Sequence, residues 1–209
     1  MLPIEQVRNL KGYKERFALQ LHGEQLELLP ENKKIFWKQL QHYLVGKTNF
    51  ANLVFSKFQP FIAERFKEQD NLEFYVETLL IQDTTNYALG PHTDASRKVV
   101  TMLFYLPSDT SQSHLGTSIY LPNDPDFRCQ GGPHHKREHF SLMHTNPFLP
   151  NTLFAFFKTD DSFHGVEKVF DPNTRRWLLL FDIYCRQKAP SAKKVKTESV
   201  NTSKVNFSF

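Results

Sequence analysis

The chain has 209 residues, of which 40% are apolar, with 26 lysine and arginine side chains against 22 aspartate and glutamate side chains. A chain of this size can bury one sizeable core, so we expect a single domain. It has no apolar run of about 18 residues that could span a membrane, its charged first residues do not resemble a signal peptide, and its two cysteines, Cys129 and Cys185, are too few for a disulfide framework. These absences predict a cytoplasmic protein with no membrane partner.

The excess of positive charge lies at the end of the chain. Residues 186–209 hold six basic side chains and one acidic side chain, Glu198, so this segment carries +5 whereas the whole chain carries +4. The preceding residues are therefore close to neutral, which argues against a nucleic-acid-binding domain. We predict one domain over 1–185 and a basic, disordered tail over 186–209.

The first seventy residues have the pattern of helices. Segment 31–47 carries apolar side chains at the spacing of an amphipathic helix, with Asn32 as its expected N-cap and Gly46 as its C-cap. The apolar stripe of this helix comprises Phe36, Leu40, Tyr43 and Leu44. Segment 49–66 predicts a second helix, interrupted near Pro60 because proline lacks the backbone N–H that a helix interior uses.

From residue 74 onward the pattern changes to short apolar or alternating runs between turn-rich segments, which is typical of strands. The predicted strands cover 74–82, 98–106, 116–121, 139–144, 152–157, 164–170 and 176–184. No crossover helices separate them, so we expect an antiparallel sandwich or barrel over about 74–185. The helical part, 1–70, is expected to pack against the outside of this barrel.

His92 and Asp94 lie two positions apart, directly after Gly90 and Pro91, which we predict to form a turn that presents the pair. Residues i and i+2 of a strand point to the same side, so an H-x-D at a strand end offers both side chains together. A second histidine would complete the two-histidine, one-carboxylate triad that holds non-haem Fe(II) and leaves three positions open. His164 heads one of the last two predicted strands. A hydrogen-bonded histidine in a partly buried strand is the alternative interpretation of that residue.

Arg176 comes twelve residues after His164 and opens the apolar strand at 176–184. Burying a guanidinium is costly unless an anion meets it, and a guanidinium can bind a carboxylate through two hydrogen bonds. The neighbouring Arg175 faces the other side of the strand, close to a turn, and we expect it to be solvated. Arg176 is therefore the candidate for binding a carboxylate.

In this order the motifs His92-Thr93-Asp94, Phe163-His164-Gly165-Val166 and Arg175-Arg176-Trp177 resemble those of the iron(II)/2-oxoglutarate-dependent oxygenases, in particular the prolyl-4-hydroxylase-like branch. The resemblance runs from about Tyr87 to Tyr184 and includes the flanking segments 101–106, 116–120 and 150–157. It implies an α+β fold with a mainly β core, a double-stranded β-helix or jelly roll. The sequence departs from the branch at Leu178, where a small hydroxyl residue is common, and in the segment 122–150, which is longer and richer in histidine.

The resemblance implies that His92, Asp94 and His164 ligate Fe(II) and that Arg176 binds the far carboxylate of 2-oxoglutarate. Tyr87 matches a position from which such enzymes often add a tyrosine to the cosubstrate pocket. The implied reaction consumes O2 and 2-oxoglutarate, releases succinate and CO2, and hydroxylates an unactivated C–H bond, with ascorbate as a further candidate cofactor. The presence of Asp94 favours hydroxylation over halogenation, because a halogenating relative lacks this carboxylate.

The substrate and the oligomeric state are left open by the sequence. A small-molecule substrate is slightly favoured because no peptide-binding appendage is evident; a prolyl or other residue of a protein or peptide is the alternative. Asp182 stands where nucleic-acid demethylases of the related repair type carry a second arginine, so no nucleic-acid partner is expected. A catalytically silent jelly-roll binding module is an alternative of another class.

The segment 129–139 combines Cys129 with three histidines. These residues lack the closed spacing of a zinc site, so zinc is disfavoured. We expect either a loop that contacts substrate at the mouth of the barrel or a solvated loop.

Overall fold

The computed structural model describes residues 8–9, 14–46 and 50–188. The elements are, in chain order, β1 (Arg8–Asn9), β2 (Arg16–Gln20), α1 (Glu24–Glu27), α2 (Glu31–Val45), α3 (Phe50–Arg65), β3 (Leu72–Thr84), β4 (Leu89–His92), β5 (Lys98–Tyr105), the 3₁₀ helix η2 (Ser113–Leu115), β6 (Ser118–Pro122), the 3₁₀ helix η3 (Arg137–His139), β7 (Phe140–Thr145), β8 (Thr152–Phe157), β9 (His164–Val166) and β10 (Arg175–Gln187). The tail predicted at 186–209 begins too early, because Arg186 and Gln187 still belong to β10 and pair with β3; from 189 onward it lies outside the described residues. Within the described ranges, no helix has both the length and the apolar character needed to cross a membrane.

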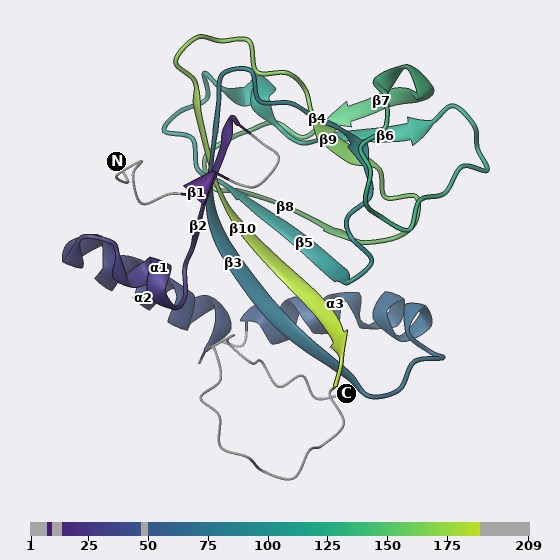
Figure 1. Cartoon of the computed structure of the whole chain (residues 1–209), viewed down its shortest axis with the longest axis horizontal. Coiled ribbons are helices and arrows are strands. Elements are labelled where there is room, and N and C mark those ends of the chain that lie inside the picture. Colours follow the sequence, from purple (N-terminus) through teal and green to yellow (C-terminus); the bar gives the residue numbers. More distant parts are fainter. Residues whose placement is uncertain (1–7, 10–13, 47–49, 189–209) are drawn as a thin grey trace.

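The strands form two antiparallel sheets. The larger sheet has the order β1-β2-β3-β10-β5-β8, and the smaller has the order β4-β9-β6-β7. From β3 to β10 the chain passes repeatedly from one sheet to the other. In Figure 1 the smaller sheet lies at the upper right, above β5 and β8 of the larger sheet. This connectivity is that of a double-stranded β-helix, so the predicted fold class is confirmed.

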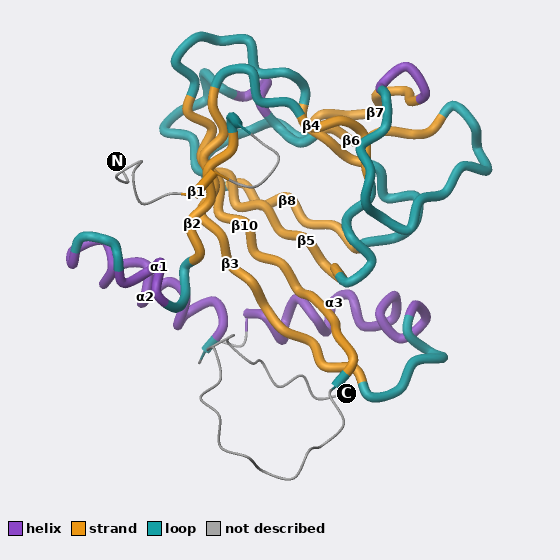
Figure 2. The backbone as a smooth tube through the Cα atoms, in the orientation of Figure 1, coloured by secondary structure: helices purple, strands orange, loops and turns teal. Residues whose placement is uncertain are grey.

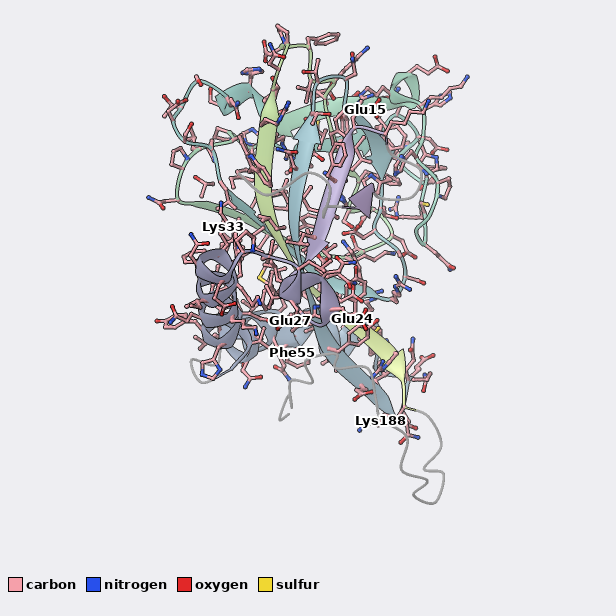
Figure 3. All side chains as sticks on the ribbon, turned by 60° about the vertical axis from the view of Figure 1, so that its left-hand side comes forward. Glu15, Glu24, Glu27, Lys33, Phe55 and Lys188 are labelled. Atoms are coloured by element: carbon pink, nitrogen blue, oxygen red, sulfur yellow. The ribbon has the colours of Figure 1, made fainter. Side chains whose placement is uncertain are left out.

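Strands β3 and β10 form the centre of the larger sheet, with 13 residues each. Most of their side chains are buried, because the helices cover one face of the sheet and the barrel interior covers the other. Figure 2 shows α2 and α3 on that outer face, as predicted. Phe55 of α3, labelled in Figure 3, packs there against Phe74 with ring centroids 4.9 Å apart.

Strand β4 is absent from the seven predicted runs. Gly90 and Pro91 give this segment the composition of a turn, yet both residues lie within the strand. The strand is short and pairs with β9 only at Leu89 and His92, across an irregularity in the register. Pro91 is tolerated in such a position because it need not donate a ladder hydrogen bond.

The cap predicted at the start of α2 is wrong. Helix α2 begins at Glu31, directly after Pro30, so Asn32 lies inside its first turn and not at the N-cap. Proline suits a helix start because the first N–H groups of a helix have no intrahelical acceptor. Gly46 occupies the C-cap, as predicted.

The apolar stripe predicted for α2 is right at Leu40 and Leu44 and wrong at Phe36 and Tyr43. Phe36 and Tyr43 are exposed, whereas Trp37 and Leu40 pack against the buried core, and Leu44 belongs to it. The side of the helix that carries Trp37 therefore faces the core, and the side that carries Phe36 faces solvent.

Two further expectations for the N-terminal part are wrong. Helix α3 continues through Pro60 without an interruption; this residue is exposed, so water can solvate the carbonyl that loses its hydrogen bond. Residues 16–20 are not helical but form β2, which pairs with β3 at the edge of the barrel. Figure 3 labels Glu15, the residue before β2, at the end of the larger sheet that is nearer the smaller sheet.

Candidate active site

Three potential metal ligands meet where the two sheets approach each other. His92 ends β4, His164 begins β9, and the two are paired across these strands. Asp94 follows His92 by two residues. The candidate ligand atoms of the three side chains all lie within 4.8 Å of one another, and no other such group of histidine, cysteine or carboxylate side chains occurs in the described part of the chain. The structure thus brings together the three residues that the sequence singled out.

Backbone carbonyls orient both imidazoles. Nδ1 of His92 lies 3.0 Å from the carbonyl oxygen of Gly90, and Nδ1 of His164 lies 3.0 Å from that of Ser162. A carbonyl oxygen only accepts, so Nδ1 is the protonated nitrogen of each ring and Nε2 carries the lone pair that a metal needs. These carbonyl partners could not be assigned from the sequence.

Burial keeps both histidines neutral. It lowers the pKa of His92 to about 3, and the neighbouring His164 adds to this effect. Burial also lowers the pKa of His164, although Asp94 opposes the shift. A metal competes with a proton for Nε2, so a neutral imidazole can bind the metal without first losing a proton.

A hydroxyl and an ammonium group hold the carboxylate of Asp94. The hydroxyl of Thr101 donates to Oδ2 at 2.6 Å, and Nζ of Lys98 lies 3.3 Å from Oδ1. Burial alone would raise the pKa of Asp94, but Lys98, His164 and the Thr101 hydrogen bond outweigh it and hold that pKa below its usual range. The carboxylate is therefore ionised, as a metal ligand must be.

Lys98 also contacts a second buried carboxylate, at 2.9 Å from Oδ2 of Asp182. Burial raises the pKa of Asp182 to about 6, and the attraction to Lys98 opposes this shift. The hydroxyl of Tyr184 donates to the same oxygen at 3.3 Å. One ammonium group thus links Asp94 to the centre of the larger sheet.

These donors fit a divalent iron ion. Two imidazoles and one carboxylate on one side of a site are typical of non-haem Fe(II) and leave further positions open to other ligands. Each of the three side chains also makes a hydrogen bond to a neighbouring group. Such hydrogen bonds set the orientation and basicity of metal ligands. His92, Asp94 and His164 are therefore suited to hold this ion.

The triad lines an internal cavity together with the predicted anion-binding arginine. The polar lining comprises Arg16, His92, Asp94, Lys98, Thr101, Thr117, His164 and Arg176, and the rest consists of Gly165 with leucine and valine side chains. Arg176 lies at the start of β10, whereas Thr101, the partner of Asp94, pairs with Asp182 further along that strand. The cavity therefore runs along the barrel interior between the triad and Arg176.

Arg176 is buried, with 1% of its surface exposed. Its Nη1 donates to Oδ2 of Asp83 at 2.7 Å and its Nε donates to the carbonyl of Leu115 at 2.6 Å. The guanidinium also lies 5.0 Å from the ring centroid of Phe148. We expected an anion beside Arg176, and the structure shows that Asp83 is one. The sequence alone did not point to Asp83. Arg175 is exposed, as predicted.

Tyr87 is fully buried and is not among the residues that line the cavity. Its ring lies beneath Arg16, with the guanidinium carbon 4.3 Å from the ring centroid. The tyrosine therefore supports a residue of the cavity wall, and its direct contact with a cosubstrate stays a prediction.

The histidine-rich segment 129–139 packs along the H-x-D motif. The carbonyl of Cys129 accepts from the Thr93 hydroxyl at 2.7 Å, and the amide of His135 donates to the carbonyl of Pro91 at 2.8 Å. The ring of His134, an exposed residue, has its centroid 4.6 Å from that of His92. This segment therefore covers the outer side of the triad.

Comparisons with known proteins gave matches among solved structures. No protein-family model matches the chain, and no curated protein matches it. A 2OG-Fe(II) oxygenase family oxidoreductase from Burkholderia pseudomallei is 10% identical, with 83% of this chain and 70% of that chain covered and a TM-score of 0.44. A Pseudomonas putida prolyl-4-hydroxylase is 12% identical, with coverages of 88% and 78% and a TM-score of 0.44. HygX from Streptomyces hygroscopicus, bound to nickel, 2-oxoglutarate and hygromycin B, is 12% identical, with coverages of 86% and 74% and a TM-score of 0.42. The chain is similar to these proteins, and the similarity extends over most of its length.

Proposed function

We propose that this protein is an Fe(II)- and 2-oxoglutarate-dependent dioxygenase that hydroxylates an unactivated C–H bond and releases succinate and CO2. The observation that carries the proposal is the shared cavity. The two-histidine, one-carboxylate triad lines it together with Arg176, which can bind a carboxylate. Iron and the far carboxylate of 2-oxoglutarate would thus each find a matching partner within one cavity.

The chain's own groups would hold and orient the reactants. Fe(II) and 2-oxoglutarate, when bound, would supply the activation of O2. Nε2 of His92 and of His164 and one oxygen of Asp94 would hold the ion. A guanidinium has five N–H donors, and the bonds to Asp83 and Leu115 use two of those on Arg176, so this group can also meet a carboxylate. The leucine and valine side chains of the lining would give the reactants apolar walls.

The substrate is proposed to be a small molecule, with a prolyl or other residue of a peptide as the alternative. His134 is exposed beside His92, so the segment 129–139 is the proposed contact region for it. The near-neutral domain supports no nucleic-acid partner. The two cysteines, Cys129 and Cys185, are free thiols, which supports a cytoplasmic location, where thiols stay reduced.

The proposal is tested by the visible charge-transfer band that a 2-oxo acid gives when it chelates Fe(II). The protein is titrated anaerobically with Fe(II) and then with 2-oxoglutarate. We expect the band in the wild type, its loss in Asp94→Ala, and at least about tenfold weaker 2-oxoglutarate binding in Arg176→Met, since hydrogen bonds to charged groups are strong. Arg175→Met is the matched control and should resemble the wild type. A wild type without the band would contradict the proposal and favour a silent binding module. Succinate release, stimulated by candidate metabolites or by peptides, would then distinguish the two substrate classes.

A further inference from the structure

Three charged residues form one row across neighbouring strands of the larger sheet. Asp83 on β3 is paired with Arg16 on β2 and with Arg176 on β10. Side chains in one row of a sheet point to the same face. Both guanidinium groups line the cavity that contains the triad, so this row forms part of the cavity wall.

Asp83 binds both arginines at once. Nε and Nη2 of Arg16 donate to its two carboxylate oxygens at 2.6 Å and 2.9 Å, and Nη1 of Arg176 donates to Oδ2 at 2.7 Å. Asp83 is completely buried, Arg176 has 1% of its side chain exposed, and Arg16 has 14% exposed. The carboxylate thus fixes the two guanidinium groups beside each other at the cavity.

An aromatic ring supports each guanidinium. Arg16 lies over Tyr87 at 4.3 Å, and Arg176 lies over Phe148 at 5.0 Å, measured from the guanidinium carbon to the ring centroid. Stacked and hydrogen-bonded guanidinium groups have little freedom left to lose when an anion binds. The pair is therefore arranged in advance of binding.

The charges of the row explain why a second arginine is needed. Arg176 and Asp83 alone would carry no net charge, and a neutral wall gives no advantage to a second carboxylate on the cosubstrate. With Arg16 the row carries +1. Because Asp83 and Arg176 are buried and Arg16 is only 14% exposed, the charge of this row acts through a medium of lower dielectric constant than water and has a larger effect.

We propose that Arg16 binds the far carboxylate of the cosubstrate jointly with Arg176, and that Asp83 positions both. This inference rests on the proposed function and adds to it. Arg16 belongs to β2, which lies outside the eight strands from β3 to β10 that build the double-stranded β-helix. The N-terminal strand thereby completes the cosubstrate site of this chain.

The test compares two 2-oxo acids that differ only at the far end. 2-Oxoglutarate and 2-oxopentanoate share the chelating group and the chain length, but 2-oxopentanoate lacks the second carboxylate. Their dissociation constants are measured by the charge-transfer band in anaerobic Fe(II)-loaded protein. The preference is the ratio of the 2-oxopentanoate constant to the 2-oxoglutarate constant.

In Arg16→Met we expect this preference to fall at least about tenfold, with 2-oxopentanoate binding unchanged. Arg175→Met, which removes an exposed arginine, should keep the wild-type preference. An unchanged preference in Arg16→Met would mean that Arg16 only joins β2 to β3, and would overturn the inference. A wild type without any band would instead contradict the proposed function.

Arg16→Met leaves part of a buried carboxylate unpaired, which destabilises the fold. A second comparison avoids that difficulty, because neither of its members retains Asp83. Asp83→Asn keeps both arginines, and Arg16→Met/Asp83→Asn keeps only Arg176. We expect the single variant to prefer 2-oxoglutarate at least about tenfold more than the double variant. Equal preferences would overturn the inference.

Discussion

Gly131 lies directly against the main chain of Asp94. A Cβ built on Gly131 would be 2.3 Å from the carbonyl oxygen of Asp94, and Gly131 has a φ of +122°. A glycine is thus required at this position both by the available space and by the backbone conformation. Through this contact the segment 129–139 is tied to the candidate ligand.

Gly131→Ala should therefore disturb the metal site. We expect the Cβ to push Asp94 or the facing segment aside and to weaken Mn(II) binding at least about tenfold, which is within the range for disturbed ligand surroundings. Gly132→Ala is a matched control, because Gly132 has a φ of +123° but nothing within 4 Å of its Cβ position. Isothermal titration calorimetry with Mn(II) would measure both. Equal losses in the two variants would show that backbone strain, not the contact with Asp94, is responsible.

Thr101→Val should weaken metal binding without a change of side-chain shape. It removes the hydroxyl that donates to Oδ2 of Asp94 at 2.6 Å, and the loss of such an orienting bond typically costs about 10- to 100-fold in metal affinity. Thr78→Val is the control, since the hydroxyl of Thr78 is buried and has no hydrogen-bond partner within the described residues. Mn(II) titrations of both variants would check this. Unaltered affinity in Thr101→Val would show that the hydroxyl does not orient the ligand.

Lys98→Met should destabilise the protein strongly. It would leave the carboxylates of Asp94 and Asp182 buried without their shared cation, and removing one partner of a buried ion pair costs about 3–5 kcal/mol. In Lys98→Met/Asp182→Asn one of these charges is also removed, so we expect part of the loss to be recovered. Urea unfolding of the metal-free proteins would measure both free energies. Additive effects of the two substitutions would argue against a direct interaction.

The metal-free protein should lose stability as the pH falls from about 6.5 towards 3. The folded pKa of His92 is lowered to about 3 and that of His164 is also lowered, whereas an unfolded histidine titrates near about 6.5. Between these values the unfolded chain binds more protons, so acid favours unfolding. Asp182 has the opposite effect, because its raised pKa of about 6 makes the folded state bind more protons between about 3.9 and 6.

The comparison of wild type with His92→Gln/His164→Gln isolates the two histidines. The unfolding temperature of each metal-free protein would be measured at pH 7.5 and at pH 5.5. We expect a smaller acid-induced decrease in the double variant. A decrease equal to that of the wild type would show that other groups determine the acid sensitivity.

The sequence predicted the triad because its signals are local and ordered. His92 and Asp94 are two residues apart, and His164 and Arg176 follow in the strands that a jelly roll brings alongside. The residues that hold the triad had no such signal. Lys98 and Thr101 look like ordinary members of a strand, and their contacts with Asp94 depend on how β5 passes the end of β4.

The N-terminal part was predicted less well, for a physical reason. Helix periodicity identified the segment of α2, but which side faces the sheet depends on tertiary packing. In the structure Trp37 packs against the core and Phe36 is exposed. Strand β2 is short and stands before a helix, so its pairing with β3 had no local signature. Arg16 was therefore not recognised as a neighbour of Arg176.

The pairing of His92 with His164 has a consequence for the order of folding. The two residues lie far apart in the sequence, because β5, β6, β7 and β8 lie between them along the chain. Contacts across such long loops form slowly, because loop closure loses chain entropy before any contact is gained. A complete set of metal donors thus exists only once β9 has joined β4. During refolding, the uptake of metal would mark the closure of the barrel.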